Sequence, residues 1–244
     1  MTAQMAESVT EEYYSRFCGT ELSGLGRGRH LVCSAERDEY LKAYGCKFSI
    51  WILVRDGLCA GAYSPKYRAF FEKFKDGGGE IIPSLSQRFP MKQRALMVFE
   101  REKLVSFGGA KALTPADFPL YEAFFREAYP KGEPDGWLRD YFMEKAHGCF
   151  TGYFSGGKLV SVCDLPDMPY MQGKIQHTGI RTLEGQRRKG YALCTAALAA
   201  HNLLARGVCP QWECGADNTA SMELAKAIGY REYGTAYILE EWNQ

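Results

Sequence analysis

The residues best suited to chemistry stand in a short basic turn, Gln186-Arg187-Arg188-Lys189-Gly190-Tyr191-Ala192. Three consecutive cations precede a glycine, and an alanine- and leucine-rich segment then predicts a helix over about 190–205. The first N–H groups of a helix have no partner within it, and the helix dipole adds about half a positive charge there. A glycine also lets the backbone approach a bulky group. The turn therefore predicts a cradle for a phosphorylated ligand.

Two titratable side chains lie in the predicted strands on either side of that helix. His177 belongs to the strand 174–181, and Glu213 to the short apolar strand 211–214. A histidine, with an ordinary pKa of about 6.5, or a carboxylate held among apolar residues can act as a general base. Each also has a structural alternative, as a packed strand histidine or a hydrogen-bonded buried carboxylate. We take both as candidate catalytic residues.

Residues 104–244 alternate helices and strands in a pattern that positions this turn. The predicted order is strand, two helices, three strands, helix, strand, helix, strand. The hairpin 149–163 precedes the strand 174–181, and Asn218 is placed to cap a helix over 219–228 that ends at Gly229. The last predicted strand covers 233–240. This order indicates a mixed α/β unit.

Residues 1–103 form a second predicted unit, an additional N-terminal α/β subdomain. Strands at 48–54 and 58–63 flank Asp56-Gly57 as a hairpin, Ser64-Pro65 starts a helix to about residue 75, and 81–82 and 95–99 are further strand candidates. Residues 11–17 predict at most a short helical turn. The glycine-rich run 24–29 lacks a preceding strand and is interpreted as an ordinary loop. Three roles stay open for this unit: a lid, a wall of the substrate site, or the contact surface of a homodimer.

Composition argues against several classes of partner. Lys and Arg total 30 against 29 Asp and Glu, which gives no bulk electrostatic reason for binding nucleic acid or an anionic membrane. The nine cysteines are odd in number and show no C-x-x-C spacing, so we expect a reducing compartment, no disulfide framework and no metal site. Residues 1–10 lack a signal-peptide pattern, and the apolar run 48–54 is too short to cross a bilayer. We therefore expect a cytoplasmic protein.

Three motifs together carry a resemblance to a known family. Arg187-Arg188-Lys189-Gly190-Tyr191-Ala192 fits the pattern Q/R-x-x-G-x-G/A, and Asn218-Thr219-Ala220-Ser221 is followed by Gly229-Tyr230. Trp212-Glu213-Cys214 is similar to the W-[DE]-C run of a bacterial branch with an extra N-terminal region. Residues 104–244 thus resemble the GNAT superfamily of N-acetyltransferases, whereas the resemblance explains nothing in 1–103.

This resemblance implies a mixed central sheet flanked by helices, and direct acetyl transfer from acetyl-CoA to a primary amine of a small molecule in a ternary complex. It implies that the pantetheine arm lies in a gap between splayed strands, pairing with the edge 178–182. The cofactor-binding residues it implies are Thr178, Gly179, Ile180, Thr182, Arg187, Arg188, Lys189, Gly190, Tyr191, Ala192, Asn218 and Ser221.

The chain departs from the family pattern at one position. Many GNAT enzymes use a tyrosine on the last helix to protonate the CoA thiolate, and that position is Ala225 here. Tyr230, Tyr233, Tyr237 or water would have to supply the proton. The departure leaves room for a non-catalytic CoA-binding sensor or scaffold, and a different acyl-CoA in the same groove is a further alternative. The sequence does not identify the acceptor amine.

Overall fold

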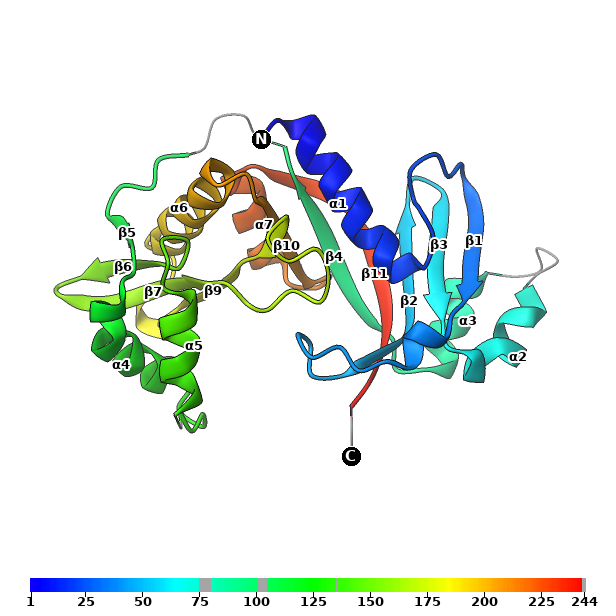
Figure 1. Ribbon diagram of the computed structural model, residues 1–244, viewed down its shortest axis with the longest axis horizontal. Coiled ribbons are helices and arrows are strands. Elements are labelled where there is room, and N and C mark those ends of the chain that lie inside the picture. Colours follow the sequence, from blue (N-terminus) through cyan, green and yellow to red (C-terminus); the bar gives the residue numbers. More distant parts are fainter. Residues whose placement is uncertain (75–79, 101–104, 135, 243–244) are drawn as a thin grey trace.

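A mixed seven-stranded sheet and an antiparallel four-stranded sheet, with helices on their faces, make up the computed structural model, which describes residues 1–74, 80–100, 105–134 and 136–242 (Figure 1). This confirms the predicted α/β class. The seven-stranded sheet has the order β1 (Gly28–Cys33), β3 (Leu58–Tyr63), β2 (Lys47–Arg55), β11 (Tyr230–Glu241), β4 (Lys92–Phe99), β10 (Cys209–Gly215), β8 (Ile175–His177). The four-stranded sheet has the order β5 (Ala110–Ala112), β6 (Thr151–Ser155), β7 (Lys158–Asp164), β9 (Gly179–Thr182).

The larger sheet joins the two ends of the chain. The last strand, β11, pairs antiparallel with β2 on one side and with β4 on the other, and β4 also pairs with β10. Segments before and after residues 101–104 therefore share one sheet. The predicted boundary at 103/104 falls on those residues, outside the described part of the chain, and the division into two domains stays a prediction.

The predicted strand over 174–181 is divided between the two sheets. Its first part, β8, pairs in parallel with β10 from Ile175 opposite Cys209 to His177 opposite Gln211. Its second part, β9, pairs antiparallel with β7, with Ile180 opposite Cys163 and Gly179 opposite Asp164. The β10 strand continues along β4 to Gly215. The sheets consequently diverge after Thr178, as the resemblance implied.

Helix α1 (Ala3–Cys18) lies across the larger sheet beside β4 and β2 (Figure 1). Thr2 caps it, and Gly19, in the left-handed conformation, ends it. The prediction of at most a short helical turn over 11–17 is wrong. The helix is stabilised by burial, because Tyr14 and Phe17 stack on Trp51 of β2, and such tertiary packing outweighs a weak local pattern.

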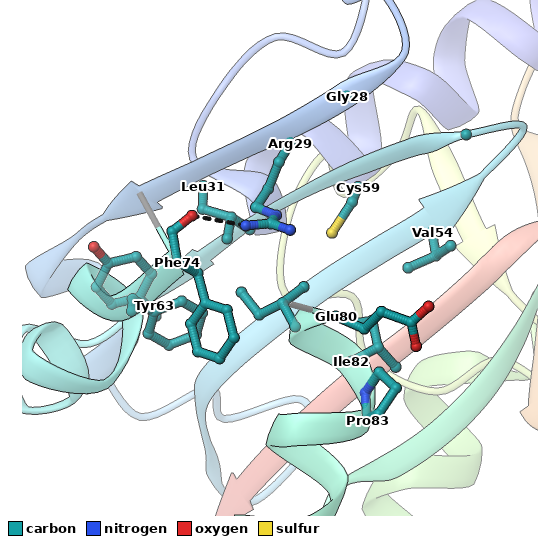
Figure 2. A pocket seen from close by; sticks show the side chains of 13 residues that line it. Gly28, Arg29, Leu31, Val54, Cys59, Tyr63, Phe74, Glu80, Ile82 and Pro83 are labelled. Atoms are coloured by element: carbon teal, nitrogen blue, oxygen red, sulfur yellow. Dashed lines mark hydrogen bonds between the residues drawn. The ribbon is translucent and has the colours of Figure 1, made fainter. Parts of the chain in front are cut away.

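The opposite face of β2 packs against α2 (Arg68–Phe71) and α3 (Ile81–Arg88). The prediction of a strand at Ile81-Ile82 is wrong, because Pro83 falls in the first helical turn, where no N–H is required. A cavity of about 660 Å³ lies between this helix and β1. Arg29 reaches into it (Figure 2) and donates to the Phe74 carbonyl at 2.7 Å. The predicted glycine stop at 77–79 lies outside the described residues.

The smaller sheet carries the remaining helices. Helices α4 (Phe118–Ala128) and α5 (Trp137–Lys145) pack against β7 through an aromatic core in which Tyr121 stacks on Phe142. Helix α6 (Tyr191–Ala205) follows β9, and α7 (Thr219–Ile228) follows β10 (Figure 1). The predicted order of elements in 104–244 is confirmed except at 174–181, where one predicted strand is the two strands β8 and β9. The predicted strand over 104–113 is shorter than expected, since β5 covers 110–112.

Candidate functional site

The basic turn joins β9 to the N-terminus of α6. Gly190 is the N-cap and adopts φ 81°, a left-handed conformation that favours glycine. Arg188 also has a positive φ, of 60°. The Cys194 N–H donates to the Gly190 carbonyl at 3.1 Å, so the helical ladder begins here. The N–H groups of the first helical turn therefore point out of the helix end, as an anion site requires.

A groove of about 550 Å³ runs from β9 past this helix end to the start of α7. Nine of the predicted cofactor-binding residues line it: Ile180, Thr182, Arg187, Arg188, Gly190, Tyr191, Ala192, Asn218 and Ser221. The other three lie nearby. Thr178 and Gly179 stand where β8 gives way to β9, and the Lys189 ammonium donates to Gln186 Oε1 at 2.9 Å. All three side chains of the cationic run are exposed.

The helix end is fixed to the smaller sheet by aromatic contact. The Tyr191 ring stacks on Tyr153 of β6, with centroids 4.3 Å apart, and its hydroxyl lies 3.3 Å from Ser155 Oγ. The Thr195 hydroxyl donates to the Tyr191 carbonyl at 2.7 Å. These contacts attach the N-terminal end of α6 to β6.

The far side of the groove is fixed to β10. Asn218 Oδ1 accepts from the Ser221 N–H at 3.1 Å, which confirms the predicted helix cap. The Trp212 indole N–H donates to Ser221 Oγ at 3.1 Å. Asn218 and Ser221 thus already have structural partners, although both still line the groove.

The two candidate catalytic residues meet beneath α1, outside the lining of the groove. His177 Nε2 lies 3.5 Å from Glu213 Oε1. The Tyr13 hydroxyl lies 3.1 Å from His177 Nε2, and the Tyr14 hydroxyl donates to Glu213 Oε1 at 3.1 Å. Burial lowers the pKa of His177, and the negative charge of Glu213 opposes this effect. The histidine is therefore neutral at physiological pH.

A half-buried arginine completes this cluster. Arg94 of β4 places Nη1 3.6 Å from Glu213 Oε2, and its Nη2 donates to Glu240 Oε1 at 2.7 Å. We call Tyr13, Tyr14, Arg94, His177 and Glu213 the α1 polar network. Glu213 and Arg94 also line a cavity of about 760 Å³ between the start of β4 and the end of β10. The contributions of Tyr13, Tyr14 and Arg94 have no local sequence signal, because their partners are more than 80 residues away.

The tyrosines considered as acids are in three different surroundings. Ala225, at the usual tyrosine position, is fully buried in α7. Burial raises the pKa of Tyr230 well above its ordinary value, and that of Tyr233 to about 12. Tyr233 carries the Arg55 guanidinium over its ring at 4.2 Å, whereas Tyr237 packs in the core beside α3. Neither Tyr233 nor Tyr237 is among the residues that line the groove.

The divided strand, the diverging sheets and the cationic helix end agree with the arrangement that the resemblance implied. Residues 138–239 match the family model described as GNAT acetyltransferase. This match places a GNAT acetyltransferase domain over these residues, as the motifs predicted. Among the described residues, no helix has the length and apolar character needed to cross a membrane.

Solved structures share this fold. An acetyltransferase from the GNAT family from Colwellia psychrerythraea matches 99% of this chain and 98% of its own, with 14% identity and a TM-score of 0.56. That likeness covers the strands before residue 100 as well as the GNAT domain. A putative GNAT acetyltransferase from Novosphingobium aromaticivorans DSM 12444 is 21% identical over 63% of this chain and 66% of its own, with a TM-score of 0.48. No curated protein matches the sequence.

Proposed function

We propose that the protein transfers an acetyl group from acetyl-CoA to a primary amine of a small molecule, by direct attack in a ternary complex. The observation that carries this proposal is the cationic N-terminus of α6, which opens onto the groove between the edge of β9 and the start of α7. Acetyl-CoA has a pyrophosphate for the first feature and an amide-containing arm for the second.

The donor would bind along the groove in a defined direction. Its pyrophosphate would accept from the first-turn N–H groups of α6, with Arg187 and Arg188 adding charge. Its pantetheine amides would pair with the edge of β9 that faces away from β7, in the manner of an added strand. The thioester would then lie near Ile180, at the closed end of the gap. The cofactor residues proposed here all belong to 104–244.

The reaction requires a neutral amine, stabilisation of the developing oxyanion and a proton for the departing thiolate. A main-chain N–H at the gap can stabilise the oxyanion, a contribution of roughly 3 kcal/mol in other enzymes. Holding both substrates in one orientation contributes further. Thiolate is already a fair leaving group, so water can protonate it where Ala225 replaces the usual tyrosine.

Thiol release tests the proposal directly. Purified protein would be mixed with acetyl-CoA and a panel of primary amines, and free CoA would be followed with a thiol reagent. We expect amine-dependent release, together with an acetylated amine detected by mass spectrometry. Parallel reactions with longer acyl-CoA donors compare kcat/KM and test the choice of acetyl-CoA.

The absence of a tyrosine at Ala225 favours a second candidate, a non-catalytic CoA-binding sensor or scaffold. Calorimetry with CoA separates the two candidates. Tight CoA binding without thiol release across the whole panel would support the sensor and contradict the enzyme proposal.

A further inference from the structure

An aromatic cavity lies between helices α4 and α5 and strands β7 and β9. Strand β9 also borders the groove. Its volume is about 260 Å³. Six aromatic side chains line it: Tyr121, Phe124, Phe125, Tyr129, Trp137 and Tyr141. The charged residues in its lining are Asp164 and Arg181. Aromatic faces carry negative electrostatic potential, so such a cavity favours a cation over an anion.

Asp164 supplies a carboxylate to this cavity. It ends β7, and its Oδ1 lies directly against Gly179 of β9, where an added methyl group would come within 2.0 Å. Among the ion pairs of the described residues, none includes Asp164. Burial raises the pKa of Asp164 to about 6, while hydrogen bonds from its own N–H, the Gly179 N–H and the Tyr141 hydroxyl oppose the shift. A partly buried carboxylate that lacks a neighbouring cation is destabilising, and a ligand can supply that cation.

Arg181 does not fill that role. Its guanidinium donates to the Ala128 carbonyl at 3.0 Å and lies 4.8 Å from the centroid of the Tyr129 ring. The arginine is therefore held at the α4 side of the cavity, and the carboxylate is left for another cation.

The cavity and the groove share a wall. Ile180 and Arg181 line both of them. Gly179, which contacts the Asp164 carboxylate, is the immediate neighbour of Ile180, near which the thioester is placed in the proposed function. A nitrogen atom held by Asp164 would thus lie beside the acyl end of the groove.

From this arrangement we propose that the aromatic cavity is the acceptor site, that it takes a primary ammonium carried on a compact apolar or aromatic group, and that Asp164 is the general base. The inference rests on the proposed acetyl transfer. A volume of 260 Å³ equals that of roughly nine water molecules, which suits an arylalkyl amine. One carboxylate provides one ion-pair partner, so the cavity suits a ligand with a single ammonium group.

The chemical step balances as follows. The ionised Asp164 carboxylate takes a proton from the ammonium, and the neutral nitrogen attacks the thioester carbonyl carbon. The new C–N bond forms as the C–S bond breaks, and the electron pair leaves with sulfur. The second proton lost by nitrogen neutralises the thiolate through solvent, and Asp164 returns its proton to solvent. The products are the acetamide, CoA thiol and one released proton.

The test compares Asp164→Asn with Asp167→Asn. Asp167 is an exposed carboxylate three residues away, paired with Lys145 at 2.7 Å, and is a matched control. With phenethylamine as acceptor, we expect Asp164→Asn to lower kcat/KM by at least 100-fold and to remove the decline in rate below about pH 6. CoA affinity should change by less than threefold, and Asp167→Asn should behave as wild type.

A binding measurement separates this inference from the proposed function. Calorimetric titration of phenethylammonium, without acetyl-CoA, should show binding to wild type and to Asp167→Asn, and at least tenfold weaker binding to Asp164→Asn. Ammonium binding without any turnover would uphold the cavity and reject the acetyl transfer. Equal ammonium affinity in wild type and Asp164→Asn would overturn the acceptor site. A full rate in Asp164→Asn, with a large loss in His177→Ala or Glu213→Gln, would move the base to the α1 polar network.

Discussion

The Asp164 carboxylate and the α-carbon of Gly179 are in direct contact across the β7–β9 pair, because a methyl group on Gly179 would lie 2.0 Å from Oδ1 and 3.1 Å from Cγ. A side chain at residue 179 would therefore force the carboxylate to rotate. We expect Gly179→Ala to lower kcat at saturating acetyl-CoA by at least tenfold, in line with the usual contribution of a positioned base.

Gly26→Ala is a suitable control, since Gly26 has open space around its α-carbon. Steady-state rates and thermal unfolding of both variants would be measured together. A Gly179→Ala protein with an unchanged kcat would show that the position of the carboxylate does not matter.

The raised pKa of Asp164 predicts a pH-dependent cost to stability. In the unfolded chain its pKa is near 3.8, and in the folded protein it is about 6. Between these values the folded state binds more protons, so the free energy of unfolding falls as pH rises from about 4 to about 6 and then stays low. The difference of roughly two units corresponds to about 3 kcal/mol at neutral pH.

Asp164→Asn removes this ionisation. Relative to wild type, the variant should have similar stability near pH 4 and gain up to about 3 kcal/mol near pH 7. Urea unfolding at both pH values measures the difference, with Asp167→Asn as reference. The expectation would be contradicted if the difference in unfolding free energy between wild type and Asp164→Asn were the same at the two pH values.

Local signals were sufficient to predict the groove. The glycine before α6, the Asn218 cap of α7 and the strand that precedes the basic turn are each encoded within a few residues, and the structure places nine of the predicted residues around one cavity. The apolar periodicity of 104–244 likewise predicted the order of elements there. These features depend on backbone conformation and local hydrogen bonds.

The acid–base surroundings could not be predicted in the same way. Asp164 ends a hairpin strand and carries no motif, and its setting arises only when α4 and α5 pack against β7. Tyr14 contacts Glu213 across 199 residues of sequence. Such contacts depend on the fold of the whole chain. The sequence therefore predicted only a short helical turn where α1 lies. For the same reason it did not rank the titratable side chains of the α1 polar network against those of the aromatic cavity.

Gly190 provides a test of the anion cradle. It caps α6 with φ 81° and has open space around its α-carbon. Gly190→Glu would place a carboxylate where the pyrophosphate is proposed to bind, and the repulsion should weaken CoA binding by at least 100-fold, measured by calorimetry.

The backbone strain of that substitution needs its own control. Gly207 follows the other end of α6, also has a positive φ, of 75°, and is equally open. Gly207→Glu should cost about 1 kcal/mol of stability, as Gly190→Glu does, but leave CoA affinity unchanged. Equal CoA affinity in the two variants would reject the cradle.

Tyr14 connects α1 to the larger sheet through two buried hydrogen bonds. Its hydroxyl accepts from Gln211 Nε2 at 2.6 Å and donates to Glu213 Oε1 at 3.1 Å. Tyr14→Phe removes both bonds and leaves the fully buried Gln211 amide with one partner fewer, although that amide still donates to the Met97 carbonyl. We expect a loss of about 1–3 kcal/mol in the free energy of unfolding, because buried polar groups without partners pay their desolvation cost.

The same variant separates structure from catalysis at Glu213. If the α1 polar network is structural, Tyr14→Phe should lower stability in urea while kcat at 25 °C stays within threefold of wild type. Tyr67→Phe is a comparison, since its hydroxyl bonds Glu241 at 2.5 Å on another part of the sheet. A tenfold fall in kcat for Tyr14→Phe, together with unchanged stability, would instead place Glu213 in the reaction. The lost hydrogen bond would then have changed a catalytic carboxylate and not the packing of α1.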